Sequence, residues 1–313
     1  MKTVRIRLLW HKQAQFAGYL IAEREKLAEA SGVRLVCEPI RFDEPGLAAV
    51  MAGKIEFAVS SPSHMLESKW ARELRFLLAV QQESSLVYPV FEDSGISRIA
   101  DLVGRRVAVW PGNEDLELKW MLRKAGVSPG DVIRVPAADT AAALFSGQVD
   151  CAQMTTYHEL RHARERGALR LFSAAALGAS LLKDGLAASR EWLAANGDVA
   201  QAAINAILQG WTIAFTDAER AVSICAEARP DMSVADHRAQ LAAIRQLSCC
   251  HAALSEGLGY PDPRHVSRVV AAMAAMADIG MTAPGYDATE IVEPRFWRAA
   301  PANWRSRTWA PAS

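Results

Sequence analysis

The sequence of 313 residues has no excess of charge of either sign. It contains 35 lysines and arginines against 35 aspartates and glutamates, so its formal net charge at pH 7 is zero. Such a chain has no overall field to attract nucleic acid or an anionic membrane surface. We therefore expect no nucleic-acid partner, and any charge selectivity must be local to a site.

Cysteines are few and follow no pattern. There are five, with no Cys-x-x-Cys motif and no paired metal-ligand spacing: Cys37, Cys151, Cys225, Cys249 and Cys250. This excludes a disulfide framework or a zinc motif as the organising principle and favours buried free thiols, with no metal. The run Cys249-Cys250-His251 is the exception, because sulfur and imidazole suit transition metals. Adjacent helical cysteines would point about 100° apart, however, which disfavours a shared ion.

Long apolar runs are also absent. No run approaches the roughly 18 residues of a membrane-spanning helix, so we expect no such span. The first ten residues, Met1 to Trp10, lack the apolar core and the cleavage site of a signal peptide. We expect a periplasmic protein if a signal peptide has been removed or omitted, and a cytoplasmic one if Met1 is the natural start.

Short apolar runs alternate with helical patterns over the first part of the chain, which predicts βα units and largely parallel sheets. Strands are expected over residues 4–9, 33–38, 57–59, 75–81, 86–90, 106–110, 132–135 and 149–154. Helices are expected over residues 16–30, 45–52, 116–125 and 140–145, and a helical tail over 189–195, 199–215, 217–227, 234–247 and 263–276. The length exceeds one core, so two lobes are predicted.

An ordered set of motifs resembles one protein family. The motifs are Trp10-His-Lys-Gln-Ala-Gln-Phe-Ala-Gly18-Tyr19, Gly53-Lys-Ile-Glu-Phe-Ala-Val-Ser-Ser61, Asp93-Ser-Gly-Ile with Asp101-Leu-Val-Gly-Arg-Arg-Val, Gly147-Gln-Val-Asp150, Met154-Thr-Thr-Tyr157-His158-Glu159, Gly210-Trp211, and Asp217-Ala-Glu-Arg-Ala-Val. Together they resemble the ABC-transporter solute-binding proteins for thiamine-pyrimidine precursors and their nitrate- and sulfonate-binding relatives. The family usually has Tyr-Asn-Glu where this chain has Tyr157-His158-Glu159.

The resemblance implies an α/β type II periplasmic-binding-protein fold, with two lobes and a ligand cleft between them. Lobe one would comprise residues 1–87 plus 185–313, and lobe two residues 88–184. The implied function is that of the solute-binding component of an ABC importer, a monomer that delivers a small molecule to permease subunits. The ligand would resemble a thiamine pyrimidine precursor.

Several lobe-one residues are candidates for ligand contact. Trp10 is expected at the carboxyl end of the first strand, where ligands of open α/β sheets bind, and its indole offers a face for a ring or a cation. A tryptophan that only fills the core is the alternative. Gln13, Phe16 and Tyr19 follow on the loop and first helical turns, and Gly18 would let the backbone approach closely.

The other lobe-one candidates lie at further strand ends. Ser60 and Ser61 end a strand and precede a helix, so they can meet a polar ligand edge or simply cap the helix. Gln81 ends the strand over 75–81. Asp184, where the chain returns to lobe one, would pair with the ligand or form a hinge turn with Gly185.

His64 raises the alternative of an enzyme. In a relative, the synthase that makes the thiamine pyrimidine from its own histidine and pyridoxal phosphate, a histidine in the corresponding stretch is consumed and a lysine four residues earlier holds the cofactor. Here Ser60 occupies the lysine position, and a Schiff base needs an amine. We therefore expect a pocket-wall or helix histidine, no cofactor and no catalytic residue.

The lobe-two candidates are Trp110, Gly112 and Asn113 in one loop, and Tyr157 and Glu159 after a strand. Free amides at the first loop suit a phosphate, but the acidic residues there would repel an anion: Glu114, Asp115 and Glu117. Acidic residues in a first helical turn are also ordinary dipole partners. Glu159 could bind a ring amine or merely start a helix. A neutral or cationic heteroaromatic or amine ligand is expected, with a sulfonate or nitrate as the alternative.

Overall fold

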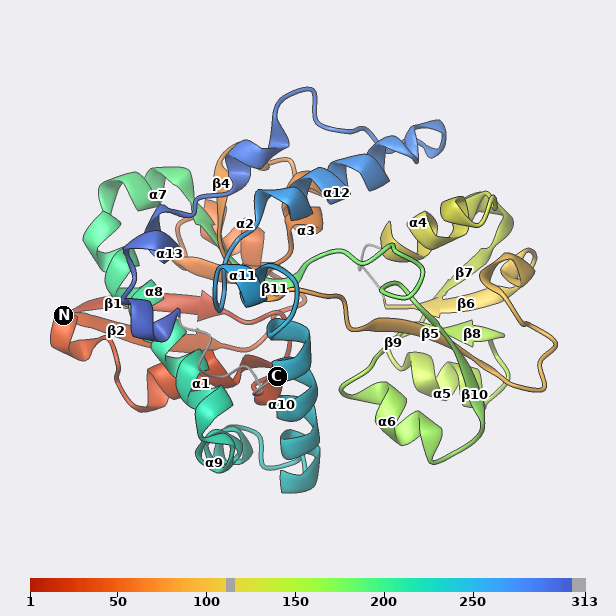
Figure 1. Cartoon of the computed structure of the whole chain (residues 1–313), viewed down its shortest axis with the longest axis horizontal. Helices are drawn as coiled ribbons and strands as arrows, with labels where there is room; N and C mark the ends of the chain where they lie inside the picture. Colours follow the sequence, from red (N-terminus) through yellow and green to blue (C-terminus); the bar gives the residue numbers. More distant parts are fainter. Residues whose placement is uncertain (111–115, 306–313) are drawn as a thin grey trace. The chain divides into compact units, whose positions relative to one another are not determined.

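The computed structural model describes residues 1–110 and 116–305, and the chain divides into two compact units (Figure 1). Unit 1 comprises Met1–Glu83, Leu182–Val266 and Asp287–Ser313. Unit 2 comprises Ser84–Leu181 and Ser267–Tyr286. The predicted lobes assigned the whole tail to lobe one, whereas residues 267–286 group with unit 2.

Unit 1 is built on a five-stranded mixed sheet in the order β2-β1-β3-β11-β4. Three strands are parallel: β1 (Lys2–Arg7), β2 (Val33–Glu38) and β3 (Phe57–Ser60). Strand β11 (Lys183–Ser189) runs antiparallel between β3 and β4 (Leu74–Gln81). Nearly every residue of β3, β4 and β11 is buried, because helices cover both faces of the sheet.

Helices of unit 1 come from both ends of its sequence. The longest are α1 (Ala17–Arg24), α8 (Gly197–Thr216), α9 (Ala218–Ala228) and α10 (Val234–Ser248). Shorter helices are α2 (Gly46–Met51), α3 (Pro62–Glu67), α7 (Arg190–Ala195), α11 (Ala252–Ser255) and α13 (Arg295–Ala299). Helix α12 (Pro263–Ala274) contains the boundary between the units.

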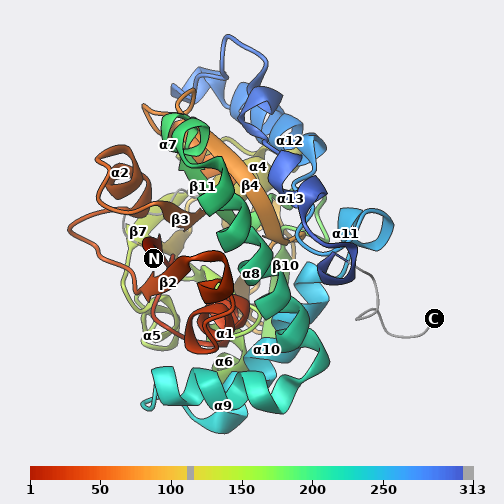
Figure 2. The same cartoon turned by 90° about the vertical axis from the view of Figure 1, so that its left-hand side faces the viewer.

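Helices α1 and α8 pack side by side in unit 1 through two glycines (Figure 2). A Cβ atom on Gly210 would lie 2.1 Å from the carbonyl oxygen of Gly18, and one on Gly18 would lie 2.2 Å from the indole of Trp211. The close approach that Gly18 permits is therefore to α8. Trp211 is fully buried and holds Tyr19 edge-on, with ring centroids 5.7 Å apart.

Unit 2 contains two three-stranded sheets. One is antiparallel, in the order β10-β5-β9, with β5 (Leu86–Phe91), β9 (Met154–Thr155) and β10 (Leu169–Ser173). The other is parallel, in the order β7-β6-β8, with β6 (Arg106–Val109), β7 (Ile133–Pro136) and β8 (Cys151–Ala152). Helices α4 (Leu116–Lys124), α5 (Thr140–Phe145) and α6 (Glu159–Arg164) complete the α/β unit.

Two expectations about the elements were wrong. The sheets are not largely parallel: the unit 1 sheet is mixed and one unit 2 sheet is antiparallel, because β10 and β11, which the sequence pattern did not indicate, both pair antiparallel. The helix expected over 16–30 ends at Arg24, since Lys26 adopts a left-handed φ of 57° and the Leu27 amide bonds back to the Ala22 carbonyl. The five cysteines are free, and Cys37, Cys151 and Cys225 are buried as expected, whereas Cys249 and Cys250 are only half-buried. Among the described residues, no helix combines the length and apolarity needed to cross a bilayer.

Candidate ligand-binding site

One edge of the unit 1 sheet collects the predicted lobe-one residues. Because β1, β3 and β4 run in one direction and β11 in the other, the carboxyl ends of the first three meet the start of β11 at this edge. Ligands of α/β sheets bind outside such strand ends. The edge carries Trp10 and Gln13 after β1, Ser60 at the end of β3, Ser61 and His64 at the start of α3, Gln81 at the end of β4, and Asp184 at the start of β11.

Asp184 is the centre of this edge. Its side chain is buried, only 4% exposed, and its backbone has a φ of 41°, a strained conformation for a non-glycine residue. Oδ2 accepts hydrogen bonds from Nε2 of Gln15 at 2.5 Å and Nε2 of Gln81 at 2.7 Å. Burial raises the pKa of Asp184 to about 6, although the Gln15 hydrogen bond and the charges of Lys183 and His64 favour the ionised form.

A relay of amides leads from Asp184 to a guanidinium. Gln13 Nε2 donates to Gln15 Oε1 at 2.9 Å, and Arg229 donates to Gln13 Oε1. Because a guanidinium only donates and a carboxylate only accepts, both amides must point their NH2 groups toward Asp184. The relay therefore polarises every bond in favour of the ionised carboxylate.

Among the buried polar atoms of unit 1 that have no partner in the described part of the chain, two belong to glutamines that bond to the relay. They are Gln81 Oε1 and Gln240 Nε2, both on fully buried side chains. Gln240 is held by its other atom, since its Oε1 accepts from the backbone N–H of Gln15 at 2.9 Å. Buried polar atoms are normally satisfied, so a ligand or a water molecule is the expected partner. Sequence reasoning did not select Gln15, although it lies in the motif over residues 10–19. It missed Arg229 and Gln240 because no motif marks them, and the contact of Gln240 with Gln15 spans 225 positions.

The serines after β3 have defined structural roles. Ser61 is the N-cap of α3, and its Oγ accepts from the His64 backbone N–H at 3.2 Å and lies 2.9 Å from Ser63 Oγ. Ser60 is buried and faces Gly185 of β11 across the sheet. The predicted cap is thus present, and ligand contact by either serine stays a prediction.

The aromatic candidates differ in exposure. Trp10 is half-buried in a bent segment beyond β1 and packs edge-on against His11 and Phe42, with ring centroids at 5.4 and 5.8 Å. Strand β1 ends at Arg7, three residues earlier, but the Trp10 carbonyl still accepts from the Ile40 amide. Phe16 and Tyr19 are fully enclosed within unit 1. They pack in its core, and their contact with a ligand stays a prediction.

The lobe-two candidates lie in unit 2. Trp110 is half-buried, packs against the unit 2 core, and donates its backbone N–H to Gln153 Oε1 at 3.2 Å. Tyr157 is buried, and Glu159 begins α6, where its Oε2 accepts from the Thr155 backbone N–H at 2.9 Å. That bond is a local one, so a ligand role for Glu159 stays a prediction. Four loop residues fall outside the described ranges: Gly112, Asn113, Glu114 and Asp115.

Glu117 has a different role from the expected repulsion of an anion. It is buried in unit 2, where Oε2 accepts from Ser84 Oγ at 2.7 Å and Oε1 from the Leu181 backbone N–H at 2.6 Å. The Glu117 carboxylate thus links the chain at Ser84 to the chain at Leu181 through two hydrogen bonds.

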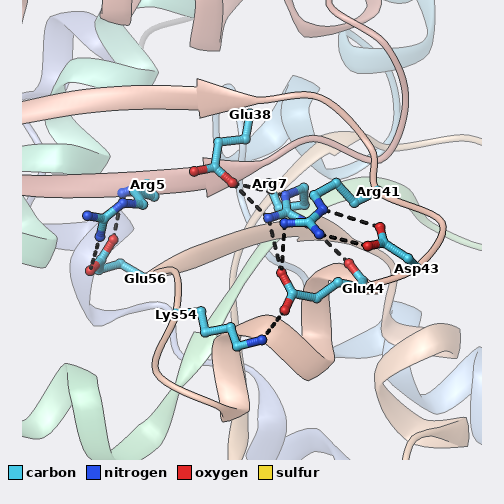
Figure 3. Close-up of polar contacts among 8 residues, drawn as sticks. All are labelled: Arg5, Arg7, Glu38, Arg41, Asp43, Glu44, Lys54 and Glu56. Carbon is cyan, nitrogen blue, oxygen red and sulfur yellow. Dashed lines mark hydrogen bonds and ion pairs between the residues drawn. The ribbon is translucent and has the colours of Figure 1, made fainter.

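The densest charge cluster of unit 1 is internally compensated and offers no free anion site (Figure 3). Arg7 is buried beneath it, with Nη2 at 2.7 Å from Glu38 and 3.5 Å from Glu44. Every member has an opposite charge within ion-pair distance: Arg5, Arg7, Glu38, Arg41, Asp43, Glu44, Lys54 and Glu56. These cations are already engaged, so the cluster is structural.

Comparison with known proteins shows which family and which solved structures this chain resembles. The sequence finds no match among curated proteins, but the family model described as "NMT1/THI5 like" matches residues 13–221. The fold is similar to that of the periplasmic aliphatic sulphonate binding protein SsuA from Escherichia coli, with a TM-score of 0.74, 18% identity, and 94% and 93% of the two chains covered.

Two further solved structures are similar. The periplasmic nitrate-binding protein NrtA from Synechocystis PCC 6803 has a TM-score of 0.70 and 13% identity, with 99% of this chain and 92% of that one covered. The desulfurization enzyme DSZB has a TM-score of 0.61 and 14% identity, with 95% and 98% covered. The predicted type II periplasmic-binding-protein fold is confirmed. Because the family model covers well over half of the sequence, the chain belongs to the NMT1/THI5-like family.

Proposed function

We propose that this protein is the solute-binding component of an ABC importer and that its ligand carries N–H donors or a positive charge on a small ring. The family membership and the likeness to two binding proteins support the first part. The buried carboxylate of Asp184 at the carboxyl edge of the unit 1 sheet carries the second part. Permease subunits are the proposed partners of a monomeric, periplasmic binder.

The chemistry of the Asp184 cluster favours a cation or an amine over an anion. A sulfonate or nitrate placed beside a carboxylate would be repelled, and the cations of the Figure 3 cluster are already paired. A ring amine could donate to Asp184 while Gln81 Oε1, which lacks a partner among the described residues, accepts a second N–H. A carboxylate and an amide acceptor together match the edge of an aminopyrimidine.

Aromatic and lobe-two groups complete the proposed site. Trp10, the half-buried aromatic candidate at this edge, would contribute a ring face. Tyr157 and Glu159 of unit 2 are proposed as further ligand contacts. Each of these roles is a proposal that mutagenesis can separate from that of Asp184.

An enzyme on this fold is the second candidate, since DSZB shares it. The synthase mechanism needs a lysine four residues before the histidine, and the residue there is Ser60, which is buried and carries a hydroxyl. A Schiff base cannot form on a hydroxyl. Incubation with pyridoxal phosphate followed by borohydride tests the enzyme alternative. A reducible adduct on a lysine of unit 1 would contradict the proposal that the protein is a binding protein.

The decisive experiment is a ligand screen combined with a charge-neutral variant. We expect a thermal-shift screen to select an amine-bearing ring over alkanesulfonates and nitrate, and calorimetry to give the affinity. Asp184→Asn should weaken that affinity by about 10- to 100-fold, because hydrogen bonds to a charged group contribute about 1.5–3 kcal/mol. Asp43→Asn, which removes the same charge from the exposed partner of Arg41, is the matched control and should leave affinity unchanged. Tighter binding of a sulfonate would overturn the assignment of ligand charge.

A further inference from the structure

A second group of ligand-type side chains lies in unit 1, none of which belongs to the relay. Glu83 follows β4 by two residues, and Cys250 and His251 form the turn between α10 and α11. The two segments are joined next to the cluster, because the Gln82 backbone N–H donates to the Leu247 carbonyl at 2.8 Å. The positions of Glu83 and of the Cys250-His251 turn are thus fixed relative to each other by a backbone hydrogen bond.

The three ligand atoms are close enough to share one ion. His251 Nε2 lies 3.1 Å from Glu83 Oε2, Cys250 Sγ lies 4.0 Å from the same oxygen, and all three atoms are within 4.8 Å of one another. Tetrahedral zinc with bonds of about 2.0–2.3 Å places its ligand atoms roughly 3.3–3.6 Å apart. Small side-chain rotations would therefore bring the set to that geometry.

The chemistry of the set selects a borderline metal ion. One thiolate, one imidazole and one carboxylate are all ordinary zinc ligands, whereas Mg²⁺ and Ca²⁺ prefer oxygen ligands alone. The site is open to solvent, since the His251 side chain is 49% exposed and that of Glu83 is 29% exposed. Three protein ligands would leave a fourth position for water.

The backbone conformation of His251 is strained, which supports a functional role for this turn. Its φ of 48° and ψ of −123° are unfavourable for a residue with a side chain. The strained turn holds the imidazole against Glu83, which comes from a strand 168 positions away in the sequence. Such strain points to a function rather than to packing.

We propose that Glu83, Cys250 and His251 form a Zn²⁺ site in unit 1. The neighbouring thiol of Cys249 takes no part in it. The sequence indicated no metal, because the ligand that completes the set lies far from the Cys249-Cys250-His251 run. The site is independent of the ligand proposed at Asp184.

Metal binding to the full chain tests this site directly. Equilibrium dialysis against micromolar Zn²⁺, followed by elemental analysis, should give one equivalent per chain. Replacement by Co²⁺ should give a thiolate-to-cobalt charge-transfer absorbance in the near ultraviolet, which requires a sulfur ligand. Cys250→Ser should abolish that absorbance, and His251→Ala and Glu83→Gln should each weaken affinity by at least about tenfold.

Cys249→Ser is the matched control, because it removes the adjacent thiol and leaves the proposed ligands intact. It should keep both the zinc stoichiometry and the cobalt absorbance. Circular dichroism and a thermal melt of each metal-free variant check that the fold survives, as expected for a partly exposed turn. Absence of stoichiometric zinc in the wild-type protein, or an absorbance that depends on Cys249 instead of Cys250, would overturn the site.

Discussion

The buried carboxylate of Asp184 should make the ligand-free protein less stable as pH rises through the range in which it ionises. The ordinary pKa is 3.8, and burial in the folded protein raises it to about 6. Between these values the folded state binds more protons than the unfolded state, so the free energy of unfolding falls with increasing pH. The stabilising contribution is complete below the ordinary pKa and is lost above about pH 6.

The size of the effect follows from the two pKa values. A separation of about two pH units corresponds to about 3 kcal/mol between pH 3 and pH 7. Asp184→Asn should remove it, because an amide oxygen can still accept from both Gln15 and Gln81 while no charge is buried. Above pH 6 the variant should therefore be more stable than the wild-type protein.

Urea unfolding of both proteins from pH 4 to pH 8 measures this difference. Subtraction of the two curves cancels the titration of all other groups, and hydrogen exchange on peptides of β11 and β4 assigns the change to unit 1. Asp43→Asn serves as the control, since Asp43 is exposed and its hydrogen bond with Arg41 lowers its pKa. A difference between wild type and Asp184→Asn that stays flat across this range would refute the buried, ionisable position of Asp184.

Three further changes test the packing and the site. Gly210→Ala should destabilise unit 1 by about 3 kcal/mol in urea unfolding, because the added methyl group would meet the Gly18 carbonyl. Ser61→Ala should cost about 1 kcal/mol, since the His64 amide loses its cap, and a stability equal to wild type would contradict the capping role. Trp10→Ala should weaken binding of a ring ligand in calorimetry, and an unchanged affinity would remove Trp10 from the site.

The positions of several strands along the chain could be predicted from local sequence patterns. Strand β2 occupies the predicted residues 33–38, and β3 and β4 differ from expectation by one residue at one end. These strands are apolar runs bounded by turn residues, so the hydrophobic pattern and the turn residues at their ends identify them. Strand β11 was not predicted, because its sequence Gly-Leu-Ala-Ala has low strand propensity. Its small residues are required by the sheet, since a Cβ on Gly185 would lie 2.2 Å from the Phe76 ring.

The candidate site was predictable only in part. The rule that ligands bind at carboxyl strand ends pointed to Ser60 and Gln81, and the expected return of the chain to lobe one pointed to Asp184. The structure places all three at one edge of the unit 1 sheet. The strand-end rule could not find Arg229 or Gln240, because Arg229 directly follows α9, Gln240 lies on α10, and the partners of both are set by tertiary packing. Residues whose role depends on a distant partner carry no local signal.

Glu117 provides a last test, because it binds both ends of the longer of the two segments that form unit 2. Ser84 is the first residue of that segment and Leu181 the last. Glu117→Ala would leave two buried donors unpaired, at a cost of about 3 kcal/mol or more. Glu117→Gln keeps an acceptor for the Leu181 amide and should cost less than half as much. Hydrogen exchange on peptides of β5 and α4 would measure both. Equal exchange in the two variants would contradict the role of the hydrogen bond to the Leu181 amide, because glutamine keeps that acceptor and alanine does not.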